Sequence, residues 1–161
     1  MVRMKVKVVG FTPDAMQPVV VITDLEEKGF IPILIGPAEA VAISQGLEGQ
    51  KTPRPMTHDL LKNVIDTLNT KIDRIVIHDL RDETYFARIY MKTKEGEFGV
   101  DSRPSDALAI QVRSGSPLYV SEEVVAKAMI TNKSETDEEK EQVRQFVAGL
   151  TPEDFLKNRK E

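Results

Sequence analysis

The sequence predicts an α+β protein with a mixed sheet or a barrel-like core, in which a strand-and-helix unit occurs twice. The first observation is a repeated motif: the seven residues from Pro37 recur 67 residues later from Pro104, in the pattern P-x-[E/D]-A-x-A-I. The second is that β-branched runs separated by a glycine-containing turn precede both motifs. We expect this internal repeat to span about residues 2–49 and 72–114.

The first copy begins with a strand over residues 2–8, where apolar and basic residues alternate with the period of a half-buried strand. A β-hairpin follows over residues 19–35, because two apolar runs flank a short turn that ends in glycine. Pro37 stands where helices tolerate proline, in the first turn, so a helix should begin there and end by Gly49.

The second copy predicts the same order of elements. Its strands cover residues 74–78, 85–92 and 98–101, and Pro104 begins its helix.

A further helix is predicted between the two copies, over residues 57–68, with Thr57 as its N-cap. Its apolar residues recur at helical spacing and are expected to face the core: Leu60, Leu61, Val64, Ile65 and Leu68. After the second copy come a short strand over residues 117–120 and a helix capped by Ser121. We divide the chain into a domain over residues 1–131 and a charged, helical C-terminal segment over 132–161.

Composition narrows the function classes. The chain has 161 residues and no cysteine, which excludes disulfides and thiolate metal sites and favours a cytoplasmic location. No apolar run is long enough for a membrane span. Residues 134–161 carry eight acidic and five basic residues, which leaves 18 acidic and 17 basic in residues 1–133. A nearly neutral core argues against a protein that grips a long stretch of phosphate backbone, although a local basic patch is compatible with it.

The repeat copies diverge just before the second helix. An apolar stretch, Leu34-Ile35-Gly36, is replaced by Asp101-Ser102-Arg103. Together with Ser105 and Asp106, these residues form a polar cluster at a helix N-terminus, where phosphate binds free N–H groups and arginine. Two carboxylates there also suit Mg²⁺ or Mn²⁺. For Asp101 and Arg103 a buried salt bridge is an equal alternative, and for Asp106 ordinary helix-end chemistry is favoured.

A second cluster lies at residues 53–59, where two prolines stiffen a loop that delivers Arg54, His58 and Asp59 to a helix start. A histidine in this position can act as a general base or as a metal ligand. A surface or capping role is equally compatible, because no established metal-binding pattern surrounds it.

At these two clusters the sequence resembles the bifunctional nuclease family, which occurs in bacteria and plants. The strings that carry the resemblance are Pro53–Leu60, Asp101–Ile110 and Ile31–Ala40, and the similarity runs from about Val2 to Met129. It implies an α+β domain, is compatible with a homodimer, and implies the nuclease activity on DNA and RNA that plant members have.

Two functional hypotheses follow. In the first, the protein is a metal-assisted nuclease with little sequence preference and no organic cofactor. Its predicted catalytic residues are His58, Asp59, Asp101 and Asp106; its phosphate-binding residues are Arg54, Arg103 and Ser105; and its Mg²⁺ or Mn²⁺ ligands are Asp101 and Asp106. In the second, the protein is a non-catalytic binding or assembly module that recognises an anionic ligand or a protein partner. The discriminating observation is whether Asp101, Arg103 and His58 converge in one open site or lie paired and buried.

Overall fold

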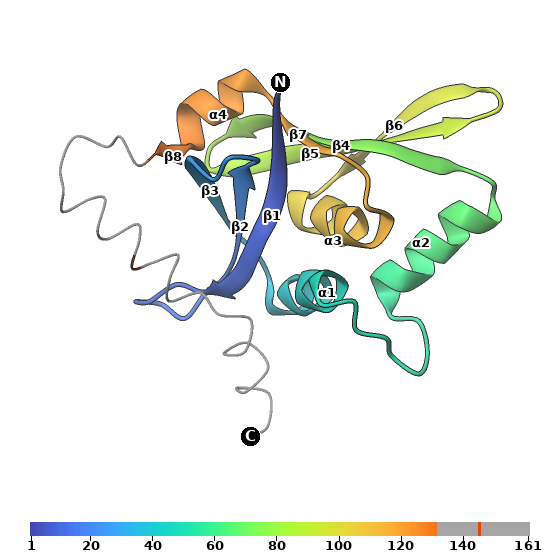
Figure 1. The fold of residues 1–161 in the computed structure, drawn as a ribbon, viewed down its shortest axis with the longest axis horizontal. Coiled ribbons are helices and arrows are strands. Elements are labelled where there is room, and N and C mark those ends of the chain that lie inside the picture. The colour runs from blue at the N-terminus through green and yellow to red at the C-terminus, as the bar shows by residue number, and fades with distance from the viewer. Residues whose placement is uncertain (132–144, 146–161) are drawn as a thin grey trace.

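The computed structural model describes residues 1–131 and residue 145. These residues form an α+β fold with one open, mixed sheet of eight strands in the order β6-β5-β4-β7-β1-β2-β3-β8 (Figure 1). The strands are β1 (Val2–Phe11), β2 (Pro18–Asp24), β3 (Gly29–Leu34), β4 (Lys71–Arg81), β5 (Thr84–Thr93), β6 (Gly96–Ser102), β7 (Leu118–Val120) and β8 (Ile130–Thr131). The helices are α1 (Pro37–Leu47), α2 (Thr57–Thr67), α3 (Pro104–Ser114) and α4 (Glu122–Ala128). The helical segment predicted over 132–161 lies outside the described residues, apart from residue 145.

Two segments of the chain have the same order of elements: three consecutive antiparallel strands and then a helix that begins with proline. The first is β1-β2-β3-α1 and the second is β4-β5-β6-α3. The short strand β7 joins them into one sheet, because it pairs antiparallel with β1 and parallel with β4. This order is the one predicted from the sequence; the duplication itself stays a prediction.

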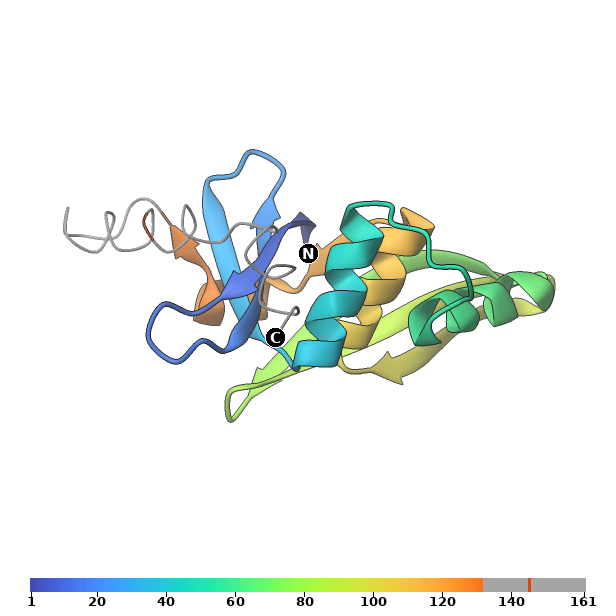
Figure 2. The same cartoon turned by 90° about the horizontal axis from the view of Figure 1, so that it is seen from below.

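The main core lies between the sheet and the two helices α1 and α3, which pack side by side on one face of it (Figures 1 and 2). Ala40 and Ile43 of α1 and Ala107 and Ile110 of α3 are all fully buried in it, and Gly46 of α1 lies close to Val112 of α3. Small side chains at this contact let the two helices approach each other closely.

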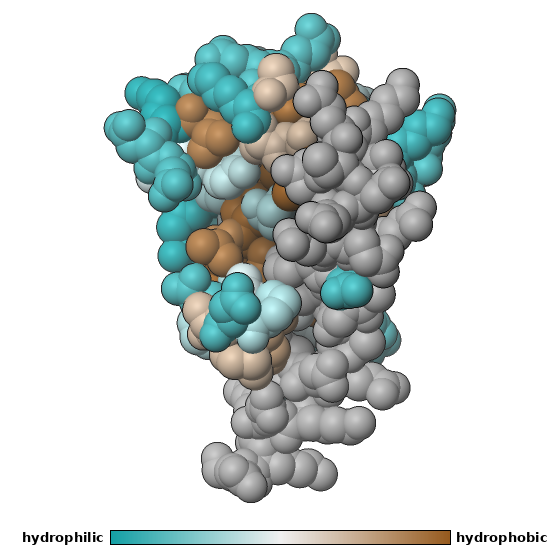
Figure 3. All heavy atoms as spheres, turned by 90° about the vertical axis from the view of Figure 1, so that its left-hand side faces the viewer, coloured by the Kyte–Doolittle hydropathy of each residue, from teal (hydrophilic) through white to brown (hydrophobic). Residues whose placement is uncertain are grey.

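The other face of β1, β2 and β3 carries a smaller buried cluster made of Val8, Val19, Val21 and Phe30. These residues alternate along the strands with residues of the main core, as the pleat of a sheet requires. Figure 3, which faces the edge of the molecule formed by β3 and β8, shows hydrophilic residues along its upper and left borders and apolar residues between them. None of the helices among the described residues could span a bilayer.

Two predictions about local structure were wrong, and one strand was missed. The N-cap of α2 is Met56 rather than Thr57, because the Asp59 carboxylate accepts a hydrogen bond from the Met56 amide and fixes the start of the helix one residue earlier. Strand β4 continues to Arg81, beyond the predicted end at residue 78. The short strand β8 was not predicted; it pairs with the start of β3.

The prediction for the apolar face of α2 was also wrong. Only Ile65 is buried, whereas the other four apolar residues that were expected to face the core are exposed: Leu60, Leu61, Val64 and Leu68. The helix packs against α3 through the side that carries Ile65 and His58. Periodicity identified an amphipathic helix correctly, but its apolar face is not covered by the described part of the chain.

Candidate functional site

The first turns of α1, α2 and α3 bring together four ionisable side chains from three distant parts of the sequence. Two of these helices begin with proline, at Pro37 and Pro104, and each has an acid two residues later, Glu39 and Asp106. The third helix contributes His58 from its first turn, and Arg103 lies at the N-cap of α3. We call Glu39, His58, Arg103 and Asp106 the Asp106 cluster.

Asp106 is the centre of this cluster. His58 Nε2 lies 2.9 Å from Asp106 Oδ1, and Arg103 Nε donates a hydrogen bond of 2.8 Å to Asp106 Oδ2. The Arg103 guanidinium also donates to Glu39 Oε1, at 2.9 Å. One arginine therefore binds the acid of α1 and the acid of α3, and one carboxylate joins that arginine to the histidine of α2.

Electrostatics keep the Asp106 carboxylate and the Arg103 guanidinium charged at neutral pH. Partial burial raises the pKa of the Asp106 carboxyl, but hydrogen bonds from Arg103 and His58 outweigh it, so the pKa lies below its usual range. Hydrogen bonds to Asp106 and then to Glu39 raise the pKa of Arg103 above its usual value. Arg103 is 65% exposed, whereas the His58 side chain is 14% exposed. The cluster thus presents a cation to solvent, while its histidine is largely covered.

The contact between His58 and Asp106 is a geometry that can support general base catalysis. A carboxylate on one ring nitrogen fixes the orientation of the imidazole and stabilises its protonated form. Within the part of the chain that the structure describes, His58 Nδ1 has no hydrogen-bond partner. That nitrogen is the atom that could take a proton from water or from a hydroxyl group.

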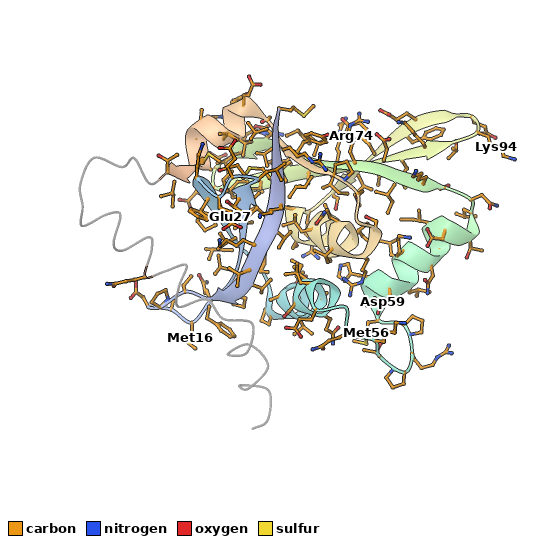
Figure 4. All side chains as sticks on the ribbon, in the orientation of Figure 1. Met16, Glu27, Met56, Asp59, Arg74 and Lys94 are labelled. Carbon is orange, nitrogen blue, oxygen red and sulfur yellow. The ribbon has the colours of Figure 1, made fainter. Side chains whose placement is uncertain are left out.

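Asp59 belongs to a separate contact, with Arg113 from the last turn of α3. Arg113 Nε donates to Asp59 Oδ1 at 2.6 Å, and the second carboxylate oxygen accepts from the Met56 amide at 2.9 Å (Figure 4 labels Asp59 and Met56). Arg113 Nη1 also donates to the carbonyls of Ala42 and Ala109, both at 2.8 Å. Hydrogen bonding to Arg113 lowers the pKa of Asp59 below its usual value. This geometry fits an ionised carboxylate that fastens α2 to the other two helices.

The remaining predicted residues do not join the Asp106 cluster through any contact of the described residues. Asp101 is exposed on β6, in register with Arg88. Arg54 is exposed in the loop before α2, and Ser105 is buried in the first turn of α3. The structure therefore brings together three of the predicted residues, namely His58, Arg103 and Asp106.

The described residues contain no group of three or more histidine and carboxylate side chains placed to hold a metal ion. Both oxygens of Asp106 are engaged by His58 and Arg103, and Asp101 supplies one exposed carboxylate. The Mg²⁺ or Mn²⁺ site predicted at Asp101 and Asp106 stays a prediction.

Two residues of these contacts were not among the predicted site residues. Glu39 stands at the position of the repeated motif that corresponds to Asp106 but was not proposed as a site residue, and Arg113 was not singled out. The repeated motif carried a signal for Glu39, because it places both acids at the same position of the two helices. A basic residue in a last helical turn is too common to have identified Arg113.

The sequence is similar to those of several known proteins. Residues 20–133 match the family model described as the bifunctional nuclease domain. An uncharacterized protein of Mycobacterium tuberculosis is 34% identical over 162 aligned residues, which cover 94% of this chain and 97% of that protein. Bifunctional nuclease 1 of Arabidopsis thaliana is 26% identical over 69% of this chain and 36% of its own length. Bifunctional nuclease 2 of Oryza sativa subsp. japonica is 30% identical over 66% of this chain and 34% of its own length.

Proposed function

Since the chain belongs to the bifunctional nuclease domain family, we propose that it hydrolyses phosphodiester bonds of DNA or RNA with little sequence preference. The observation that carries the proposal is the convergence of His58, Asp106 and Arg103 from two helices on one partly open site. A histidine held by a carboxylate beside an exposed guanidinium combines a base with a phosphate-binding group.

In the proposed reaction His58 accepts a proton from the attacking water, and Asp106 orients the imidazole and stabilises its charged form. The water oxygen bonds to phosphorus as the P–O bond to the leaving sugar oxygen breaks, and that oxygen takes a proton from the protonated His58 or from solvent water. Arg103 holds the phosphate and offsets the negative charge that develops on it. Arg103 can serve in this way because its side chain is mostly exposed, so a phosphate can take the place of Glu39 as its partner. Arg54 and Ser105, from the loop before α2 and the first turn of α3, are proposed as further phosphate contacts.

The proposal keeps Mg²⁺ or Mn²⁺ as an assisting ion near Asp101, although the described residues alone do not fit a metal centre. Mg²⁺ is commonly held by one or two carboxylates together with substrate phosphates and water, so bound nucleic acid would have to complete such a site. When bound, the ion would stabilise negative charge on the phosphate. The roles of His58, Asp106 and Arg103 do not depend on it.

One observation favours the second candidate, a non-catalytic module that binds an anionic ligand or a protein partner. The carboxylates of Glu39, Asp59 and Asp106 are all paired with arginines, as in a core that ion pairs lock together. In that case Arg103 would bind an anion or a partner without any reaction.

The test is cleavage of labelled single- and double-stranded DNA and RNA by the purified protein with Mg²⁺, Mn²⁺ or EDTA. His58→Gln and Asp106→Asn should each reduce the rate by about 100-fold or more, the usual contribution of a general base and of the carboxylate that orients it. Asp101→Asn is the matched carboxylate variant: it should reduce only the metal-dependent part of the rate. Lys94→Ala, at the exposed tip of the β5–β6 hairpin, is the control and should cleave normally (Figure 4).

Cleavage that survives in both His58→Gln and Asp106→Asn would contradict this site. Absence of cleavage under every condition, from protein with native circular dichroism, would favour the binding module.

A further inference from the structure

Helix α2 exposes a continuous apolar face. The exposed fractions are 56% for Leu60, 42% for Leu61, 45% for Val64 and 70% for Leu68. At 100° per residue these four side chains fall on one side of the helix, about a quarter turn from the side that carries His58 and Ile65. We call these four residues the α2 stripe. A stripe of this kind on a surface helix ordinarily covers a core, but here the described part of the chain leaves it uncovered.

The α2 stripe lies at one end of the molecule, where the sheet also exposes apolar side chains. Figures 1 and 2 show that α2 and the β5–β6 hairpin both extend beyond α3 in the same direction. On β6, Phe98 and Val100 are 48% and 45% exposed and pair with Met91 and Ile89 of β5. They therefore share the side of the sheet that carries the main core.

The α2 stripe alone has the size of an interaction site. Its four side chains present on the order of 400 Å² of apolar area, within the range of the largest patches on monomeric proteins, which are often functional. A second copy of the stripe would bury such an area on both partners.

The lack of charge on the α2 stripe indicates what kind of partner it binds. The exposed face contains no charged side chain: its flanking residues on one side are Met56, Asn63 and Thr67, while Lys62 pairs with Asp66 on another side of the helix. An uncharged apolar face gives nothing to phosphate groups, so nucleic acid is a poor occupant. A second stripe of the same kind meets no like charge and buries apolar area on both partners.

The stripe is also symmetric in sequence. Leu60 and Leu68 lie four residues on either side of Val64, so an antiparallel helix with the same sequence places leucine opposite leucine and Val64 opposite itself. We propose that a second copy of this chain packs antiparallel on the α2 stripe and forms a two-fold symmetric dimer centred on Val64. This inference specifies the surface for the homodimer compatible with the resemblance, and it does not rest on the proposed nuclease activity.

The test uses opposite charges at the symmetry centre. Sedimentation equilibrium of the wild-type protein should give twice the chain mass of 18.1 kDa. Val64→Glu and Val64→Lys should each give monomers, with the dissociation constant raised at least about 100-fold, because each variant buries two like charges against each other. An equimolar mixture of the two variants should recover the dimer, since the charges are then opposite. Leu25→Glu, a leucine 52% exposed in the turn after β2, is the matched control and should remain dimeric.

A wild-type protein that stays monomeric at all concentrations would overturn the proposal. So would a dimer that Val64→Glu leaves intact, or variants that do not recover the dimer on mixing. Because Val64 is exposed, native circular dichroism of both variants should accompany the loss of the dimer.

Discussion

Positions 67 residues apart in the two segments lie in opposite environments at the third strand. Ile31 and Ile33 of β3 are buried in the main core, whereas their counterparts in β6, Phe98 and Val100, are exposed. The cause is the place of each strand in the sheet. Strand β3 lies between β2 and β8, while β6 is the free edge at the other end and extends beyond α3. The same local pattern thus builds the core in one segment and a surface in the other.

The helices of the two segments show the reverse. Their buried residues occupy corresponding positions, whereas the residues at their N-caps differ. Ala40 and Ile43 of α1 and their counterparts in α3 are all fully buried. At the N-caps, Gly36 corresponds to Arg103, and the arginine binds the acids of both helices. The comparison indicates that shared apolar positions form the core, and that Arg103, the proposed phosphate-binding residue, lies where the segments diverge.

The largest expected effect is a loss of stability when a buried residue of β3 is truncated, compared with truncation of its exposed counterpart in β6. Ile33→Ala should lower the free energy of unfolding by about 3 kcal/mol, because it leaves a cavity in a close-packed core. Val100→Ala should lower it by less than about 1 kcal/mol, because the valine is already 45% exposed. Urea denaturation of both variants at low protein concentration measures the difference. A Val100→Ala cost equal to that of Ile33→Ala would mean that β6 is covered in solution and that the contrast is false.

A smaller effect is expected at the counterparts Gly46 and Arg113. The Arg113 guanidinium occupies the space beside Gly46: a Cβ added to this glycine would clash with Val112 and lie 2.9 Å from Arg113 Nη1. Gly46→Ala should therefore lower stability by about 1–2 kcal/mol, even though alanine is the better helix former. Thermal denaturation measures this change.

The matched control for Gly46→Ala is Gln45→Ala, at the preceding position of the same helix and only partly buried. It should change stability by less than about 0.5 kcal/mol. If Gly46→Ala were stabilising, the close contact between α1 and Arg113 would not exist in solution.

The order of the elements was predictable because it depends on local signals: apolar runs of strand length, glycine in the turns, and proline at the starts of α1 and α3. The convergence of His58 with Asp106 was not, since it depends on how α2 packs against α3. Periodicity in α2 revealed an apolar face but not what covers it, because a core and an interface select the same residues. The N-cap of α2 was predicted at Thr57 because threonine is a common N-cap residue. In the structure the N-cap is Met56, whose backbone amide donates a hydrogen bond to Asp59.

The smallest expected effect concerns the two acids that share Arg103. The pKa of Asp106 is depressed in the folded protein, so its stabilisation is present above its usual pKa of 3.8 and is lost as pH falls through the lower folded value. Asp106→Asn should therefore cost on the order of 1 kcal/mol at pH 7 and flatten the loss of stability below about pH 4. Glu39→Gln removes the negative charge from one partner of an arginine that is mostly exposed, and should cost less at pH 7. Urea denaturation midpoints from pH 7 to pH 2 test this order. Equal effects of the two variants would mean that the contact between His58 and Asp106 adds nothing to stability. Asp106 of the second segment would then not differ in this respect from Glu39 of the first.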